Sequence, residues 1–236
     1  MQTNVLEYLE QTVRTVPEKV AFIGEDTKLT FRQLYDQSRA IGSFLHREAI
    51  YKKSVVVFMK KQPRTIAAFL GVIYGGCFYV PLDEEMPRHR IELILSKLSP
   101  GAILYDETTR PSAEALTCGC KIISYDDAAF GVIDEAALGL IRERQLDIDP
   151  IYIVFTSGST GVPKGVMGNH RAVIDYIENL CGVLRFDETT VFGNQTPLYF
   201  DACLKEIMAT LKYGAQTYLI PKHFFLFPVR MVEYLN

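Results

Sequence analysis

The chain has 236 residues, of which 48% are hydrophobic, so it can bury a substantial core and is expected to be globular. Its formal net charge is -3, and its 25 Lys and Arg residues are spread along the chain, which argues against nucleic-acid or anionic-membrane partners. No apolar run is long enough to span a membrane, and the first residues do not resemble a secretory signal. We therefore expect a cytoplasmic protein whose ligands are small molecules or proteins.

Helical and strand patterns alternate along the sequence. Strands buried on both faces and separated by helices predict an α/β fold with a parallel or mixed sheet. In chain order we expect a helix over residues 31–47, a strand over 54–59, a helix over 63–75, a strand over 78–82, a helix over 87–98, strands over 102–105 and 121–124, a helix plus connector within 126–150, a strand over 151–155, a helix over 173–182, an extended piece over 190–200, a helix over 202–213, a strand over 216–220 and a helix from 228.

The five cysteines stand at positions 77, 118, 120, 181 and 203. They form no CxxC pair and have no histidines at zinc-ligand spacing, so we expect neither a metal site nor a disulfide framework. Cys77, Cys181 and Cys203 lie within apolar patterns and are interpreted as core residues rather than nucleophiles.

The loop that directly follows the strand at 151–155 has a composition suited to an anion. Its glycines let the backbone approach a ligand closely, its hydroxyls add hydrogen-bond donors, and Lys164 supplies a positive charge. Because Pro163 occupies the position where a Walker A motif requires its second glycine, the commonest phosphate loop is excluded. Composition alone leaves open a second interpretation, a flexible surface loop with a solvated lysine.

The order of residues narrows this choice. Residues 152–166 read YIVFTSGSTGVPKGV, which resembles the signature of the AMP-forming adenylating superfamily. Three further segments agree in order and spacing: residues 29–34 (LTFRQL), 75–83 (GGCFYVPLD) and 199–201 (YFD). The resemblance covers essentially the whole chain and is closest to amino-acid adenylation domains of nonribosomal peptide synthetases and to D-alanine–carrier protein ligases.

The resemblance implies a two-step reaction. A carboxylate and ATP give an acyl-adenylate and pyrophosphate, and a thiol, expected on the phosphopantetheine of a carrier protein, then takes the acyl group. Lys164 would offset charge on the leaving pyrophosphate and is the expected catalytic residue. The residues expected to bind ATP are Thr156, Ser157, Gly158, Ser159, Thr160, Gly161 and Lys164.

Asp201 is the expected substrate-binding residue. It aligns with the aspartate that binds the α-ammonium group in amino-acid-activating members, through a charge-assisted hydrogen bond. The alternative is structural, because Asp201 stands just before a helical pattern, where Asp is a preferred N-cap. The run from Asp83 to Glu85 is interpreted as a solvated turn. His170 is a minor candidate for a residue that lines the site.

The last helical pattern stops at Asn236 before it could bury its face, so we expect residues 1–236 to be an incomplete large amino-terminal domain of the adenylating fold, without the small carboxy-terminal domain. The family's adenine-binding segment, the acidic residue for Mg²⁺ and the adenylation-step lysine are expected downstream, and the fragment alone is expected to be inactive. An acyl-CoA synthetase, or a non-catalytic nucleotide-binding or interaction fragment, remains an alternative.

Overall fold

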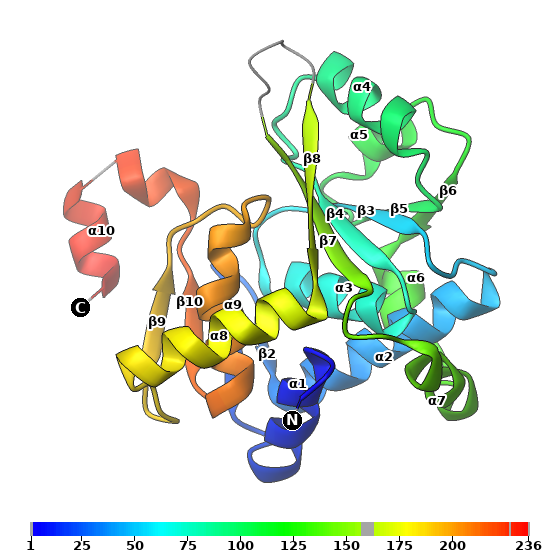
Figure 1. Cartoon of the computed structure of the whole chain (residues 1–236). Helices are drawn as coiled ribbons and strands as arrows, with labels where there is room; N and C mark the ends of the chain where they lie inside the picture. Colours follow the sequence, from blue (N-terminus) through cyan, green and yellow to red (C-terminus); the bar gives the residue numbers. More distant parts are fainter. Residues whose placement is uncertain (1, 157–162, 227, 236) are drawn as a thin grey trace.

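The computed structural model describes residues 2–156, 163–226 and 228–235 (Figure 1). The elements, in chain order, are α1 (Leu6–Thr15), β1 (Val20–Ile23), β2 (Lys28–Thr30), α2 (Phe31–Arg47), β3 (Ser54–Phe58), α3 (Pro63–Tyr74), β4 (Phe78–Pro81), α4 (Arg88–Leu98), β5 (Ala102–Tyr105), α5 (Arg110–Glu114), β6 (Lys121–Ser124), α6 (Tyr125–Ala129), α7 (Glu135–Arg144), β7 (Pro150–Thr156), β8 (Lys164–Asn169), α8 (His170–Leu184), β9 (Val191–Asn194), the 3-10 turn η1 (Asp201–Cys203), α9 (Leu204–Tyr213), β10 (Gln216–Leu219), the 3-10 turn η2 (Lys222–Leu226) and α10 (Pro228–Leu235).

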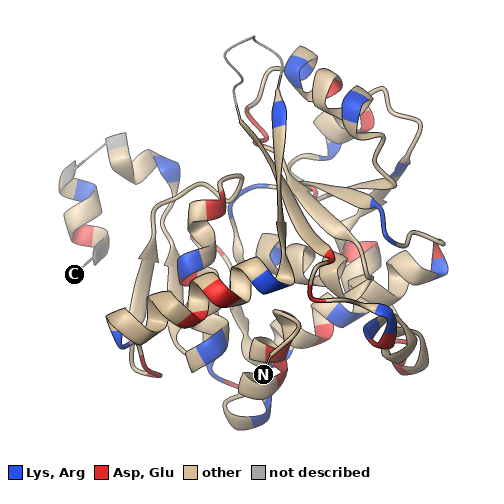
Figure 2. Ribbon diagram, viewed as in Figure 1, with Lys and Arg blue, Asp and Glu red and all other residues tan. Residues whose placement is uncertain are grey.

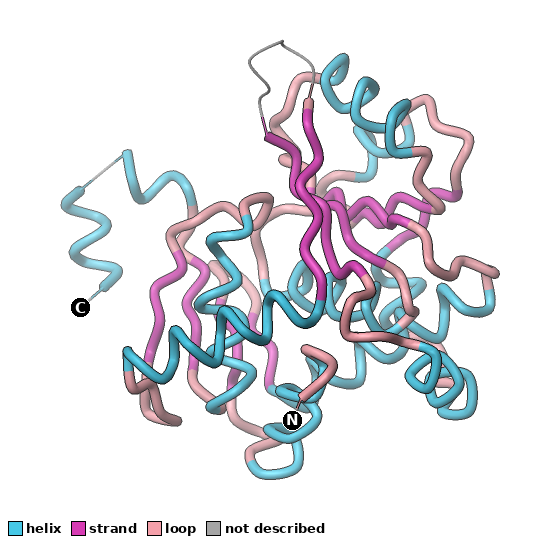
Figure 3. The backbone as a smooth tube through the Cα atoms, in the orientation of Figure 1, coloured by secondary structure: helices cyan, strands magenta, loops and turns pink. Residues whose placement is uncertain are grey.

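Two sheets organise the part of the chain that the structure describes (Figure 3). The larger has the order β6-β5-β3-β4-β7-β8, and its neighbours are parallel except for the β7–β8 hairpin. The smaller has the order β2-β1-β10-β9, in which only β1 and β2 are antiparallel. The predicted α/β fold with mixed sheets flanked by helices is therefore confirmed.

The continuous apolar run of β3 follows from burial on both faces of the larger sheet. Val55 and Val57 belong to the main core, which also contains the apolar faces of α2 and α3. Val56 and Phe58 point to the opposite face and join a second core with α4 and α5. Because successive side chains of a strand alternate between faces, a strand covered on both sides must be apolar throughout.

Helices α2 and α3 approach each other through two glycines. A Cβ at Gly71 of α3 would lie 2.6 Å from the Cβ of Ile41 and 3.0 Å from the carbonyl of Ser38, both in α2. A Cβ at Gly42 of α2 would lie 2.7 Å from the Cβ of Tyr74 in α3. Since any side chain would push the backbones apart, these two positions set the distance between the helices.

Several predicted boundaries were wrong for identifiable reasons. Helix α8 runs through Gly182 to Leu184 and ends where Arg185 adopts a left-handed conformation. The expected extended piece over 190–200 is a strand only at Val191–Asn194, because Pro197 has no N–H for a ladder and its carbonyl instead accepts from the N–H of Phe200 in a turn. Among the described residues, six helices and strands had no counterpart in the sequence prediction: α1, β1, β2, α5, α6 and β8.

His170 fastens the amino-terminal segment to α8 rather than lining a site. It stands at the end of β8 opposite to Lys164, is only 1% exposed, and its Nδ1 accepts a hydrogen bond of 3.2 Å from the N–H of Val5. Burial, followed by the charge of Arg142, lowers the pKa of His170 from 6.5 to about 4. The imidazole is therefore neutral at physiological pH, and its expected role as a site wall was wrong.

Positions of Lys and Arg and positions of Asp and Glu are interspersed along the described elements (Figure 2). Among the helices described, none has the length and apolar character needed to cross a bilayer.

We expect Gly71→Ala to lower the free energy of unfolding by about 1–3 kcal/mol, because the added methyl overpacks the contact between α2 and α3. Gly139→Ala is the matched control: it lies in α7, where a Cβ would meet nothing within 4 Å, and should raise stability by roughly 0.5–1 kcal/mol. Urea denaturation of both variants measures the two changes. Equal effects would contradict the close approach.

A second prediction concerns pH. Because folding lowers the pKa of His170 from 6.5 to about 4, the unfolded chain binds the proton more tightly, and stability is lost as pH falls through this window. His170→Asn keeps a hydrogen-bond acceptor but does not titrate. Between pH 6.5 and pH 4, the free energy of unfolding of the wild type should fall by roughly 3 kcal/mol more than that of the variant. Urea denaturation at each pH measures both values. Parallel pH profiles would rule out a buried neutral His170.

Candidate functional site

The predicted phosphate loop joins the two strands of a hairpin rather than a strand and a helix. Thr156 ends β7 and Lys164 begins β8, and the two residues are cross-strand partners. Both are exposed, and the hydroxyl of Thr156 donates a hydrogen bond of 3.5 Å to the carbonyl of Lys164. The remaining predicted phosphate ligands lie outside the described residues: Ser157, Gly158, Ser159, Thr160 and Gly161.

One face of this hairpin carries both ends of the loop and a tyrosine. Side chains alternate along a strand, so Tyr152, Val154 and Thr156 share a face, and Lys164 joins it as the partner of Thr156. Tyr152 pairs with Gly168, where a Cβ would lie 2.3 Å from the Cζ of Tyr152. The ring of Tyr152 therefore lies across Gly168, and only glycine leaves room for it.

The predicted substrate residue Asp201 lies beside this tyrosine. The two residues line an open pocket of about 260 Å³, whose other walls are largely apolar side chains of α8, η1 and α9: Ala172, Val173, Tyr176, Ala202 and Leu204. Burial, followed by the carboxylate of Asp201, raises the pKa of Tyr152. Tyr152 and Asp201 line this pocket, whereas Thr156 and Lys164 lie farther along the same hairpin face and do not line it.

The capping alternative for Asp201 is wrong. Asp201 opens the 3-10 turn η1, and the cap residue of α9 is Cys203, which makes no side-chain capping hydrogen bond. The carboxylate of Asp201 is exposed at the pocket instead. Phe200 is the cap residue of η1 and Cys203 is the cap residue of α9, so Asp201 occupies neither cap position.

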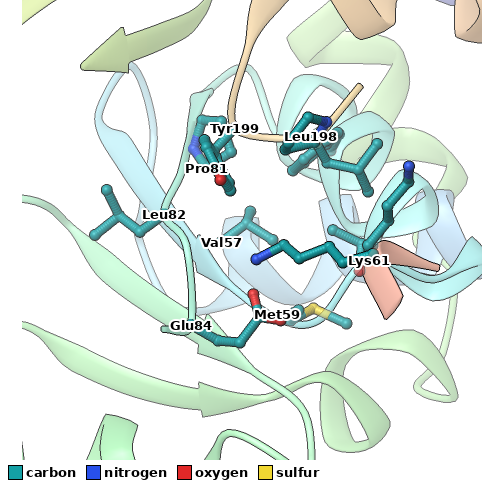
Figure 4. A pocket seen from close by; sticks show the side chains of 12 residues that line it. Val57, Met59, Lys61, Pro81, Leu82, Glu84, Leu198 and Tyr199 are labelled. Atoms are coloured by element: carbon teal, nitrogen blue, oxygen red, sulfur yellow. The ribbon is translucent and has the colours of Figure 1, made fainter. Parts of the chain in front are cut away.

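A second group of polar residues, missed by the sequence analysis, surrounds a small cavity where β3 and β4 end (Figure 4). Figure 4 shows Glu84 and Met59 on one side of this cavity, with Tyr199 and Leu198 opposite them. The Nζ of Lys61 donates a hydrogen bond of 2.8 Å to the carbonyl of Asn194. Burial lowers the pKa of Lys61 to about 8 and raises the pKa of Glu84.

The run from Asp83 to Glu85 is not a freely solvated turn, which corrects the expectation for this segment. Lys222 Nζ lies 3.1 Å from both the Asp83 and the Glu85 carboxylates, and only 17% of the Asp83 side chain is exposed. The partner lies 139 residues away in sequence, so no local pattern could reveal it. Lys61 and Glu84 were detectable in principle, because each closely follows a parallel strand, where ligands commonly bind.

The two cavities differ greatly in volume. The cavity between Lys61 and Glu84 holds about 20 Å³, which is room for about one water molecule. The pocket beside Asp201 is more than ten times larger and opens to solvent, as a substrate pocket requires. The hydroxyl of Thr156 and the ammonium of Lys164 are groups that fit phosphate. The described residues include no cluster of His, Cys, Asp and Glu that could hold a metal ion.

Comparison with known proteins identifies the family. A family model described as "AMP-binding enzyme" matches residues 9–236. The chain therefore belongs to the AMP-binding enzyme family.

Its relatives include peptide synthetases and carrier-protein ligases. Surfactin synthase subunit 1 of Bacillus subtilis is 32% identical over 92% of this chain, which spans 6% of that protein. The D-alanine–D-alanyl carrier protein ligase of Staphylococcus haemolyticus is 28% identical over 99% of this chain, which spans 46% of the ligase. The chain therefore matches less than half the length of these relatives.

Solved structures support the fold. A four-domain nonribosomal peptide synthetase bound to AMP and glycine superposes with a TM-score of 0.83 at 23% identity, over 99% of this chain and 17% of that one. The N-terminal subdomain of Klebsiella oxytoca NpsA gives a TM-score of 0.75 at 22% identity, over 99% of this chain and 58% of that one.

Proposed function

We propose that the full-length gene product activates an amino acid with ATP as an acyl-adenylate, which a carrier-protein thiol then takes up. Membership of the AMP-binding enzyme family supports the adenylation step. Relatives named as peptide synthetases and as a D-alanine–D-alanyl carrier protein ligase favour an amino acid as substrate and a carrier protein with phosphopantetheine as acceptor.

The single observation that carries this proposal is the shared face of the β7–β8 hairpin. Tyr152 is four residues from Thr156 along β7, a distance of about 13 Å at the usual rise per residue. A phosphate group at Thr156 and Lys164 and an amino acid at Asp201 would therefore approach the hairpin on one side, with their reacting groups between the two positions.

The proposed role of the loop is electrostatic. The ammonium of Lys164 offsets charge that builds up on the leaving pyrophosphate, and Thr156, Ser157, Ser159 and Thr160 donate hydrogen bonds to phosphate oxygens. Gly158 and Gly161 let the backbone come close to them. No covalent intermediate on the protein is involved.

The proposed role of Asp201 is to bind the α-ammonium of the substrate. An exposed carboxylate at the edge of an apolar pocket forms a charge-assisted hydrogen bond with an ammonium, while the walls contributed by α8, η1 and α9 hold the side chain. The same carboxylate would disfavour a fatty acid, because an alkyl chain would desolvate it without giving it a partner. This argues against the alternative of an acyl-CoA synthetase.

Residues 1–236 are proposed to form part of the large domain of the adenylating fold. The groups that bind adenine and Mg²⁺ and the lysine of the adenylation step are proposed to lie outside this sequence. The described residues contain no group of three or more His, Cys, Asp and Glu that could hold the metal by themselves. The chain by itself is then expected to be inactive, and a role as a non-catalytic nucleotide-binding or interaction module is the second alternative.

Lys164→Ala in the full-length gene product should slow adenylate formation roughly 100-fold, because it removes a preorganised positive charge from the phosphates. ATP–pyrophosphate exchange measures this step. Lys28→Ala is the matched control, since Lys28 is also an exposed strand residue but lies in the other sheet. Unchanged exchange in a folded Lys164→Ala protein would refute the role of this lysine.

Asp201→Asn should lower kcat/KM for the amino acid roughly 10- to 100-fold, the usual effect of losing a hydrogen bond to a charged group. Exchange is measured with panels of amino acids, fatty acids and aryl acids. Asp175→Asn, an exposed aspartate of α8, is the control. Exchange that depends on fatty acids and is insensitive to Asp201→Asn would favour the acyl-CoA synthetase alternative. No exchange with any acid would favour the non-catalytic one.

A further inference from the structure

Two thiols meet in the connector between α5 and β6. The Sγ atoms of Cys118 and Cys120 are 2.7 Å apart, and both cysteines are free and partly exposed. Gly119 lies between them, and a Cβ at this position would meet nothing within 4 Å. Cys77, Cys181 and Cys203, in contrast, are each at most 2% exposed. Cys118 and Cys120 are therefore the pair that a reagent in solution can reach among the cysteines.

The cysteine pair borders an open pocket of about 380 Å³. The other walls come from α4 and the turn that follows it, with Thr117 of the connector itself: Glu92, Leu95, Ser96, Ser99, Pro100 and Thr117. These residues include three hydroxyl groups and one carboxylate, so a small polar molecule can be solvated while it contacts the sulfurs. The pocket provides the access that thiol exchange requires.

We propose that Cys118 and Cys120 form a dithiol site that low-molecular-weight disulfides, such as glutathione disulfide, convert to an internal disulfide. The two sulfurs already face each other at a distance shorter than their van der Waals contact, so closing the bond needs only a small movement of the connector. All five cysteines are free in the structure, so the proposed disulfide forms only on oxidation.

The reaction proceeds by two exchanges. The thiolate of Cys118 attacks one sulfur of the small disulfide, forms a mixed disulfide and releases one small thiolate. Cys120 then loses its proton to solvent and attacks the Cys118 sulfur, which releases the second small thiolate. The two protein thiols are oxidised, the small disulfide is reduced to two thiols after protonation, and no other oxidant is needed.

The environment of Cys120 disfavours it as the first nucleophile. Burial, followed by the hydrogen bond and charge of Cys118, raises the pKa of Cys120. Since only thiolates attack disulfides, we place Cys120 second, where it attacks the sulfur held beside it.

The bond formed should be easily reversed. A disulfide that spans a single residue closes a small ring, in which the preferred distances and dihedral angle are difficult to reach. Strained and exposed disulfides are the readily reduced ones. The site also lies apart from the hairpin, because β6 is one edge of the larger sheet and β7 lies four strand spacings away, about 19 Å.

The test is oxidation of the reduced full-length gene product by glutathione disulfide under native conditions, followed by acid quenching, alkylation and mass mapping of the peptide that contains residues 118–120. The wild-type peptide should lose two hydrogens, resist alkylation and carry no glutathione, and dithiothreitol should restore both thiols. Cys118→Ser and Cys120→Ser should instead each retain one glutathionyl group or one free thiol. Cys203→Ser, which removes a buried cysteine, is the matched control and should behave as the wild type.

The proposal would be overturned if both thiols of the wild type remained open to alkylation after this treatment. A stable glutathione adduct on Cys118 or Cys120 in the wild type would overturn it as well, because it would mean that the second thiol cannot reach the first. Pyrophosphate exchange does not enter the readout, so the outcome is independent of the proposed adenylation.

Discussion

The register between β7 and β8 determines where the candidate site lies. Thr156 faces Lys164 and Tyr152 faces Gly168, and a shift of one residue would turn half of these side chains to the other face of the sheet. Gly168 fixes the register sterically, since any Cβ there would collide with the tyrosine ring. On its other side β7 pairs with β4, where the rings of Tyr79 and Tyr152 lie 6.0 Å apart. The hairpin is thus anchored at one end and exposed at the other, where its loop begins.

Near the ends of the parallel strands, charged side chains pair with residues from distant parts of the chain. Lys222 bridges Asp83 and Glu85, and Lys61 reaches the carbonyl of Asn194 at the end of β9. Partly exposed ion pairs contribute only about 0–1 kcal/mol each, so these contacts order the turn after β4 more than they stabilise the fold. Lys61 and Glu84 are both shifted toward their neutral forms by burial. They surround a cavity of about 20 Å³, which is much smaller than the pocket of about 260 Å³ beside Asp201.

Local sequence patterns predicted the helices and strands that are specified by interactions between neighbouring residues. The capping box of Thr30 and Gln33 forms as expected at the start of α2, and the helix spans the predicted residues. The apolar run of β3 is a strand buried on both faces. Strand β8 was missed because its residues Lys164–Asn169 are mostly exposed and include two glycines, so no apolar alternation marks it. Its strand conformation comes from pairing with β7, which is a tertiary contact.

The sequence by itself determined the fold class and the family, because the order of residues in 152–166 and in three companion segments is specific. It also indicated Thr156, Lys164 and Asp201 as parts of one site. Only the tertiary structure decided that Asp201 faces a pocket with Tyr152 rather than capping α9, that Lys222 covers the turn at Asp83, and that the sulfurs of Cys118 and Cys120 meet. The physical reason is the separation in sequence over which each interaction acts. Helix periods and caps act over three or four neighbouring residues, whereas a pocket or an ion pair depends on chain segments that meet only when the sheets assemble.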